Sequence, residues 1–288
     1  MIGFRSRLVL SAAALLCASA VVVRADEAPV APSLATQPTI SLVATSSAST
    51  ADVATFLKAP VSFSVKDASF LSALDAVLLS SGKNCFIECR EVKPMKMSFS
   101  IRSSTAGRVL DALARAGGCT LYVLPTKLLI APASLLEQSE RAEAKPFTVL
   151  VSAATLPAGK TLPKQANGVD MLALANKNIS VSIQGLEPAN AMSACRKAGP
   201  ILGAYTHWST PRDRLANNIQ TSLTLSFDQI PFAEALSVVG ELGGCQLYLL
   251  PDTFHLRSPD QPLTPEEKKL AVPAFITNFP SGPSAPSA

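Results

Sequence analysis

An internal repeat restricts the fold of this chain more than any other feature of its sequence. The nine residues Gly117–Pro125 (GGCTLYVLP) return 126 residues later as Gly243–Pro251 (GGCQLYLLP), and seven of the nine positions are identical. The same shift, without a gap, aligns residues 97–134 with residues 223–260. Self-similarity over this length indicates a duplication, so the fold is expected to contain two copies of one structural unit.

A shorter repeat lies inside each copy. In the first copy, Val61–Val65 and Met97–Ile101 share one alternating pattern of apolar and hydroxyl residues, 36 residues apart. In the second copy the pattern returns at Ile179–Ile183 and Leu223–Phe227. Strict alternation predicts half-buried strands, because successive side chains of a strand point to opposite faces. The chain is therefore predicted to contain four strand-then-helix half-units, arranged as two pairs.

The residues after the alternating strands change to helical spacing. Apolar side chains fall on one stripe between Phe70 and Leu78 and between Phe232 and Val239, and glycines follow at the expected helix ends. Short strands are then predicted at Cys85–Cys89, Cys119–Leu124, Leu128–Ala131, Cys245–Leu250 and Phe254–Arg257. The predicted fold class is α+β, with two tandem small modules, residues 59–134 and residues 175–260. Each module is expected to be strand-helix-strand-strand-helix-strand-strand, with two helices packed on small sheets.

The first 25 residues have the pattern of a secretory signal peptide. Arg5 and Arg7 precede an apolar run, Leu8–Val23, and small residues lead to a predicted cleavage after Ala25. The alternative is a membrane anchor, but this run of 16 residues is shorter than the ~20 that cross a bilayer. The mature chain is therefore expected in the periplasm or outside the cell, without a membrane span.

Composition excludes several classes of protein. The formal net charge is +4, and cleavage would remove Arg5, Arg7 and Arg24, leaving 22 basic against 21 acidic residues, or +1. This balance does not suit a protein that must neutralise many phosphates of a nucleic acid. Two histidines exclude a His-rich metal site, and 48% hydrophobic residues exclude a wholly disordered chain. No catalytic group, no metal and no cofactor are expected.

Three further segments are predicted to lie outside the modules. Residues 26–58 are rich in Ala, Pro, Ser and Thr and are interpreted as a linker. Residues 135–174 are interpreted as a connector, in which residues 135–144 favour a helix and residues 147–151 a strand. Residues 261–288 are interpreted as a Pro-rich tail, extended or flexible.

Each copy resembles the short N-terminal (STN) domain shared by secretins and signal-transducing TonB-dependent receptors. The likeness rests on Val61–Val65 with Lys66–Ala68 and Leu71–Gly82, and on Phe227–Gly244 leading into Leu247-Tyr248. It covers about 160 of the 288 residues. The resemblance implies non-catalytic periplasmic modules that assemble into rings or bind a signalling partner. No segment after residue 260 is expected to form a pore or a receptor barrel.

The resulting functional expectation is a non-enzymatic protein-interaction or scaffold module of the cell envelope. The resemblance favours an accessory of a secretion or type IV pilus-type complex, with a secretin or the pilus machinery as partner. An alternative is a signalling module that relays the state of an outer-membrane receptor to a regulator. A third class, a hydrolase or small-molecule binder, predicts a deep polar pocket between the copies. Self-association is left open.

Five cysteines follow the predicted cleavage site: Cys85, Cys89, Cys119, Cys195 and Cys245. Pairing is the default expectation for an exported chain. Cys85 and Cys119 are predicted to begin neighbouring strands, so a disulfide between them would stabilise a small, marginal module by roughly 3–4 kcal/mol. The alternative is that all five are small apolar residues of the core. No Cys/His cluster completes a zinc site.

The second copy has additional residues between its halves, at about 200–222. Aromatic and Arg residues dominate binding hot spots, and this stretch holds the only Trp of the chain. The candidate partner contacts are Tyr205, His207, Trp208, Arg212 and Arg214. The alternative is that Tyr205–Trp208 is the counterpart of the Cys85–Cys89 strand and simply packs. The hydroxyl faces of the alternating strands are a further candidate, since a partner's strand can pair beside them, and the alternative is that they are ordinary solvated faces.

Overall fold

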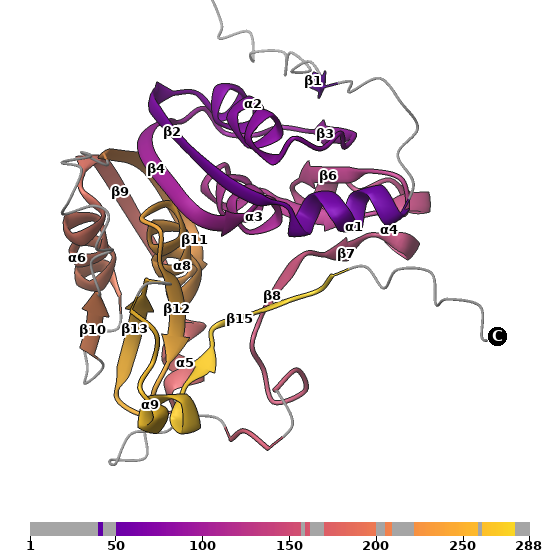
Figure 1. Cartoon of the computed structure of the whole chain (residues 1–288). Helices are drawn as coiled ribbons and strands as arrows, with labels where there is room; N and C mark the ends of the chain where they lie inside the picture. The colour runs from indigo at the N-terminus through magenta and orange to yellow at the C-terminus, as the bar shows by residue number, and fades with distance from the viewer. Residues whose placement is uncertain are drawn as a thin grey trace, which may run out of the picture. The chain divides into compact units, whose positions relative to one another are not determined.

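The computed structural model describes residues 40–42, 50–156, 159–161, 170–199, 205–208, 222–258 and 261–279. It confirms the α+β class, and both copies have the predicted order of elements (Figure 1). The first copy consists of β2 (Pro60–Ala68), α2 (Phe70–Ser81), β3 (Ile87–Cys89), β4 (Lys96–Thr105), α3 (Ala106–Ala116), β5 (Thr120–Val123) and β6 (Leu128–Ala131). The second copy consists of β9 (Asn178–Leu186), α6 (Pro188–Ala198), β10 (Tyr205–Trp208), β11 (Ser222–Pro231), α8 (Phe232–Leu242), β12 (Gln246–Leu249) and β13 (Thr253–Arg257).

The local sequence explains the ends and the buried face of α2. The Ser69 side chain caps the first turn by accepting a hydrogen bond from the Ser72 N–H. Gly82 ends the helix in the left-handed conformation, with φ at 58°, which glycine adopts without strain. Phe70 and Leu74, four residues apart, are buried on the same side of the helix. This is the apolar stripe that the sequence predicts.

Among the described residues the strands form four sheets. The first copy has an outer sheet with the order β1-β3-β6-β5-β7, where β1 is Ile40–Leu42 and β7 is Lys145–Pro146. The second copy has the corresponding sheet β10-β13-β12-β14, where β14 is Val272–Pro273. The sheet β2-β4-β11-β9 takes two strands from each copy, and β8 (Thr148–Leu150) pairs with β15 (Phe275–Thr277).

An approximate twofold axis relates the two copies. β4 and β11 pair antiparallel with Met97 opposite Leu223, and these residues are equivalent in the repeat, 126 residues apart. β8 and β15 pair antiparallel with Val149 opposite Ile276, which are 127 residues apart. Antiparallel pairing of equivalent residues is the pattern of a symmetric dimer interface. Here the interface lies within one chain.

The same symmetry governs the backbone hydrogen bonds beside β8 and β15. The N–H of Asn278 donates to the carbonyl of Phe147 (2.7 Å), and the N–H of Val151 donates to the carbonyl of Ala274 (2.9 Å). Each of these donors and acceptors has its counterpart 127 residues away. The two copies also share one hydrophobic core, in which α3 packs against α8. They form one folded unit rather than two modules on a linker.

Part of the predicted linker is a helix of the core. Residues 50–58 form α1 (Thr50–Lys58), and Val53, Phe56 and Leu57 are fully buried. β1 lies in the same predicted linker and pairs with β3. The linker interpretation is therefore wrong for both segments. A helix of nine residues is marginal by itself, so packing against the rest of the fold, which the local pattern does not reveal, stabilises it.

The repeat continues beyond the two predicted modules. α4 (Gln138–Glu143) and α9 (Pro265–Leu270) are equivalent helices, 127 residues apart. The helix and the strand predicted in the connector are confirmed at α4 and β8. The interpretation of residues 261–288 as a tail is wrong as far as Phe279, because α9, β14 and β15 are folded there and Val272 is fully buried. These elements are short and lie among prolines, so no sustained period of hydrophobic residues predicts them.

Two smaller helices complete the described elements. A 3-10 helix at Ala133–Leu135 precedes α4. α5 (Met171–Ala175) lies just before β9, in the place that α1 has before β2. The predicted signal peptide, residues 1–25, lies outside the described residues. Within the described part of the chain, none of the helices has the length and hydropathy needed to cross a membrane.

Candidate functional site

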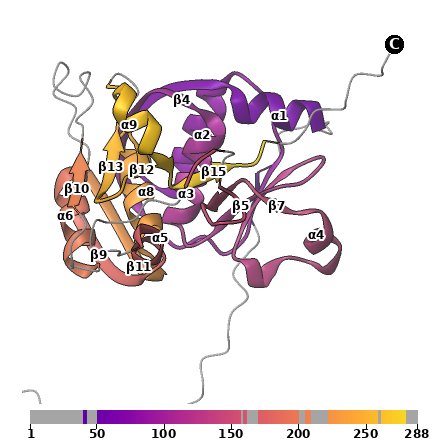
Figure 2. The ribbon, with the colours of Figure 1, turned by 90° about the horizontal axis from the view of Figure 1, so that it is seen from below.

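The predicted contact residues Tyr205, His207 and Trp208 lie together in β10, at the end of a sheet. β10 runs parallel to β13, and no strand of the described residues lies on its other side. Figure 2 shows β10 at the outer end of the sheet, with β13 between it and β12. Arg212 and Arg214, the other two predicted contacts, lie outside the described residues.

β10 is the counterpart of β3, as the alternative interpretation of Tyr205–Trp208 predicts. β3 pairs in parallel with β6, with Ile87 opposite Leu128. β10 pairs in parallel with β13, with Thr206 opposite Phe254. Leu128 and Phe254 are equivalent in the repeat, 126 residues apart, so the two edge strands occupy the same place in the two copies.

The outer edge of β3 is already occupied. β1 pairs antiparallel with β3, with Ile40 opposite Cys89 and Leu42 opposite Ile87. This short strand precedes the first copy in the sequence, and its three residues are too few for their alternation to predict a strand. Its position shows that this edge of the unit accepts an extended segment as an additional strand.

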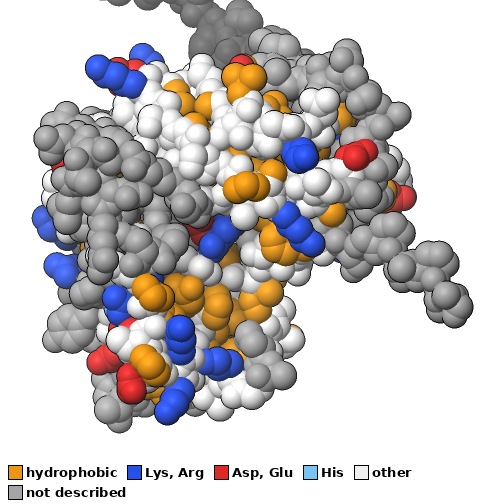
Figure 3. All heavy atoms as spheres, viewed as in Figure 1, with side chains coloured by type: hydrophobic (Ala, Val, Ile, Leu, Met, Phe, Trp, Pro, Cys, Tyr) orange, Lys and Arg blue, Asp and Glu red, His pale blue; other side chains and the backbone are white. Residues whose placement is uncertain are grey.

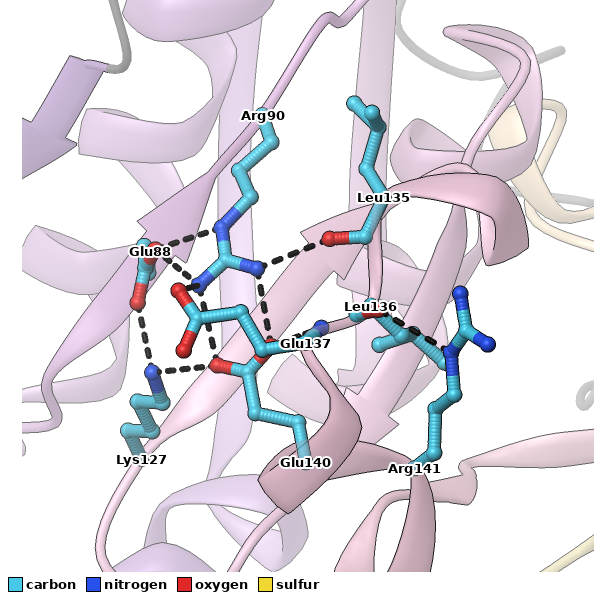
Figure 4. Close-up of polar contacts among 8 residues, drawn as sticks. All are labelled: Glu88, Arg90, Lys127, Leu135, Leu136, Glu137, Glu140 and Arg141. Carbon is cyan, nitrogen blue, oxygen red and sulfur yellow. Dashed lines mark hydrogen bonds and ion pairs between the residues drawn. The ribbon is translucent and has the colours of Figure 1, made fainter.

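A cluster of charged side chains fastens α4 to the outer sheet of the first copy. Figure 4 shows Arg90 between Glu88 of β3 and Glu140 of α4, with Lys127 beside both glutamates. Arg90 Nη1 donates to Glu140 Oε2 (2.8 Å), and Lys127 Nζ donates to Glu140 Oε1 (2.8 Å). Lys127 Nζ also donates to Glu88 Oε2 (2.6 Å). Each charge has opposite charges next to it, so the cluster holds elements together rather than offering a reactive group.

Protonation of Glu140 is expected to weaken this attachment at low pH. Hydrogen bonding from Arg90 lowers the pKa of the Glu140 carboxyl from 4.5 to about 2. A carboxyl whose pKa is lowered on folding stabilises the protein above its unfolded pKa, and this contribution disappears as the pH falls from 4.5 to about 2. At neutral pH the variant Glu140→Gln should therefore have a free energy of unfolding roughly 3 kcal/mol lower than wild type, and it should unfold at a lower urea concentration. The difference should shrink below pH 4.5, and a constant difference down to about pH 2 would contradict this account.

The predicted Cys85–Cys119 disulfide is absent. No disulfide joins any of the five described cysteines, and all five are buried. The premise of neighbouring strands is wrong, because β6 lies between β3 and β5 in the sheet. Burial raises the pKa of four of the thiols to about 12, which keeps them protonated at neutral pH: Cys85, Cys89, Cys119 and Cys195. The structure agrees with the alternative, small residues of the core.

The helices α3 and α8 meet near the twofold axis with complementary charges. Arg108 and Arg115 of α3 are equivalent in the repeat to Glu234 and Glu241 of α8, 126 residues apart. Arg108 Nη2 lies 3.4 Å from Glu241 Oε1. Burial raises the pKa of Glu234, and the charge of nearby Arg115 opposes this effect. Two identical copies of α3 would bring like charges together, so the junction favours the pairing of unlike copies.

Asp111 connects this junction to the β8–β15 pair. Its carboxylate lies 2.7 Å from Arg115 Nη2, and only 2% of the Asp111 side chain is exposed. The Thr148 hydroxyl of β8 donates a hydrogen bond to the same carboxylate (2.8 Å). The Arg115 guanidinium lies over the Phe275 ring of β15, 4.6 Å from its centroid. The ion pair therefore joins α3 to both strands of the small sheet.

A cleft lies between the two copies, beside the α3–α8 junction. Its volume is about 340 Å³, and residues of α3, α8, β12, β13 and α9 line it. The lining includes Ser104, Arg108, Glu241, Tyr248, Arg257 and Lys268. The third class considered from the sequence, a hydrolase or small-molecule binder, predicts a deep polar pocket between the copies; only Ser104 and Arg108 of the first copy line this cleft. No group of three or more His, Cys, Asp or Glu side chains in the described residues is arranged to hold a metal ion.

These features define a pseudo-symmetric α+β protein, in which two copies of one unit share a sheet and a core. Comparison of the chain with protein-family models, with curated proteins and with solved structures gives no significant match. The functional conclusions below therefore rest on the residues and geometry of this chain.

Proposed function

We propose that this protein is a non-enzymatic interaction module of the cell envelope and that the outer edge of β10 binds its partner. The observation that supports the proposal is a difference between the outer edges of β3 and β10, which are equivalent strands of the two copies. β1 covers the edge of β3, whereas β10 is the last strand of its sheet within the described residues. The edge of a sheet presents backbone N–H and C=O groups that pair readily with an extended segment of another protein.

β1 indicates the form that the partner's segment takes. It is extended, it pairs antiparallel, and its sequence, Ile40-Ser41-Leu42, alternates apolar and hydroxyl residues. On β10 such a segment would gain affinity from backbone hydrogen bonds and specificity from its alternate side chains. The strand that it would contact contains the predicted partner contacts Tyr205, His207 and Trp208.

The class of partner follows from the sequence. Each copy resembles an STN domain, and the N-terminal pattern of the chain favours export. We therefore propose a periplasmic or secreted accessory of a secretion or type IV pilus-type complex, with a secretin or the pilus machinery as the partner. A signalling role, in which the partner is an outer-membrane receptor or a regulator, is the alternative that the same experiment distinguishes.

In-cell photo-crosslinking tests the proposal. A photoreactive amino acid is placed at Thr206 in β10 and, as the control, at Leu79 of α2, whose side chain is 83% exposed. Crosslinks from Thr206, but not from Leu79, to a secretin or a pilus protein would support the scaffold function. Crosslinks to a receptor or its regulator would support the signalling alternative. Equal products from the two positions, or no partner from Thr206, would contradict binding at the β10 edge.

Proline substitution then tests the strand pairing itself. In a parallel pair, successive residues direct their N–H groups to opposite sides of the strand. Of His207→Pro and Trp208→Pro, each made with the photoreactive amino acid kept at Thr206, one removes an N–H that faces β13 and the other removes an N–H that faces the outer edge. The outer-edge variant should keep the fold by circular dichroism and lose the crosslink. If both variants fold and keep the crosslink, the partner does not bind by strand addition.

A further inference from the structure

The sheet that the two copies share, β2-β4-β11-β9, has two equivalent edges. It ends in β2 on one side and in β9 on the other, and no strand of the described residues lies beyond either. β2 and β9 begin 118 residues apart, and so do α2 and α6, the helices that follow them. The pairing is also the same in the two copies. Phe63 of β2 lies opposite Ile101, and its counterpart Val181 lies opposite Phe227, the equivalent of Ile101.

The edge of β2 is covered by a side chain of α2. The N–H of Ser62 donates to Ser80 Oγ (2.9 Å), and the Ser80 hydroxyl donates to the carbonyl of Ser62 (3.1 Å). Both backbone groups of Ser62 therefore point away from β4, and both are satisfied. β2 also contains Pro60, Lys66 and Asp67, and prolines and charges are residues that keep an edge strand from pairing with other chains.

The edge of β9 lacks both forms of protection. Ala198 of α6 stands at the position equivalent to Ser80, and its methyl group cannot form these hydrogen bonds. Ser180 is equivalent to Ser62, so its N–H and C=O point away from β11, and those of Ser182 do the same because alternate residues of a strand are alike. β9 has no charged residue and no proline, whereas Figure 3 shows Lys and Arg side chains gathered over α9, β12 and β13 of the same copy. An uncharged edge strand of nine residues is suited to pairing with another strand.

We infer that β9 pairs antiparallel with β9 of a second copy of this chain, so that two shared sheets become one continuous sheet. The centre of the strand, Ile179–Ile183 (ISVSI), reads the same in both directions. Pairing about Val181 therefore places Val181 opposite its own counterpart and Ser180 opposite Ser182. The outward N–H and C=O groups of the two serines then exchange hydrogen bonds. This self-complementarity is what a twofold interface between identical chains requires.

The side chains of β9 favour the same pairing. Val181 is half-buried, whereas Ile179 and Ile183 on the same face of the strand are 3% and 0% exposed. A second β9 covers Val181 with its counterpart, and apolar side chains directly opposite each other stabilise an antiparallel pair. The β2 residues Val61–Val65 (VSFSV) are symmetric too, but Ser80 already occupies the backbone groups of that edge. The inferred junction repeats between chains the antiparallel pairing that β4 and β11 make within one chain.

Disulfide trapping tests the geometry of the pair. Val181→Cys places two thiols opposite each other in a non-hydrogen-bonded pair, where the Cα atoms are ~4.5 Å apart, within the range that a disulfide spans. With oxidised glutathione as the oxidant, the purified variant should form a covalent dimer. Val65→Cys makes the same replacement in β2 and should remain monomeric. The five described native cysteines are buried, so they should not contribute.

Sedimentation velocity tests the pair without a covalent bond. The wild-type protein should convert from monomer to dimer as its concentration rises. Ser182→Pro removes an N–H that points away from β11, so it should keep the fold and weaken dimerisation at least tenfold. Ser64→Pro is the equivalent change in β2, 118 residues earlier, and should leave dimerisation unchanged. Circular dichroism of both variants distinguishes a loss of the dimer from a loss of fold.

Three results would overturn the inference. One is a wild-type protein that stays monomeric at every concentration while Val181→Cys forms no covalent dimer. Another is an equal effect of Ser182→Pro and Ser64→Pro, since this would place the interface elsewhere. The third is a disulfide in cells between the Val181→Cys variant and a different protein, which would assign this edge to another partner. The β9 edge belongs to the shared sheet and the β10 edge to an outer sheet, so none of these results decides the crosslinks from Thr206.

Discussion

Replacement of Asp111 by alanine is expected to lower the free energy of unfolding by about 3–5 kcal/mol. Asp111 and Arg115 form a buried ion pair, with 2% and 7% of their side chains exposed. Without Asp111 the Arg115 guanidinium stays buried without its carboxylate, and the Thr148 hydroxyl loses its acceptor. The midpoint of urea unfolding measures the loss, provided that the dependence on urea is unchanged.

The chain provides a matched control for this substitution. Asp75 occupies the same place in the short repeat, 36 residues earlier, but it is exposed on α2. Asp75→Ala should change the stability by less than about 0.5 kcal/mol. The double variant Asp111→Leu with Arg115→Met should regain much of the loss, because it removes both buried charges together. Similar effects of Asp111→Ala and Asp75→Ala would show that the junction does not depend on the ion pair.

Phe56→Ala is expected to have an effect of similar size, about 3–5 kcal/mol, because it leaves a cavity in the core. The Phe56 side chain of α1 is fully buried, although the sequence pattern places it in a linker. Leu79→Ala removes a large apolar side chain that is 83% exposed and should cost little, so thermal unfolding of the two variants compares core with surface. Equal midpoints for Phe56→Ala and wild type would mean that α1 does not belong to the core.

Local sequence patterns predict the repeated unit well. The alternating strands and the helices after them have long, regular periods, and the order of elements in both copies is confirmed at β2–β6 and β9–β13. α1, β1 and α9 are not predicted, because each is short and depends on distant partners. β1, for example, is three residues long and is defined by its pairing with β3 rather than by its composition.

The contact between the copies is harder to predict than the copies themselves. A repeat shows that two units exist, but it does not show that Met97 pairs with Leu223 across a twofold axis. One signal is present in the sequence. Arg108 and Arg115 align with Glu234 and Glu241, and an exchange of charge at equivalent positions is what a junction of unlike copies requires. An alignment of the two copies by charge, and not only by hydrophobicity, predicts that α3 and α8 meet at this junction.

The candidate sites were predictable to different degrees. The position of Tyr205–Trp208 as a counterpart of the β3 strand follows from the repeat and is confirmed. The prediction of a Cys85–Cys119 disulfide is wrong because the order of strands within the sheet cannot be derived from spacing along the chain. The cleft combines Arg108 with Lys268, which belong to different copies, so the tertiary structure is needed to bring them together.

Hydrogen exchange followed by mass spectrometry tests most directly whether the two copies unfold as one unit. Amides of β5 in the first copy and of β12 in the second should exchange through the same global opening, with equal opening free energies. Asp111→Ala should lower both by the same amount, although Asp111 belongs to the first copy. Separate opening free energies, with β12 unaffected by the substitution, would contradict a shared core around a twofold axis.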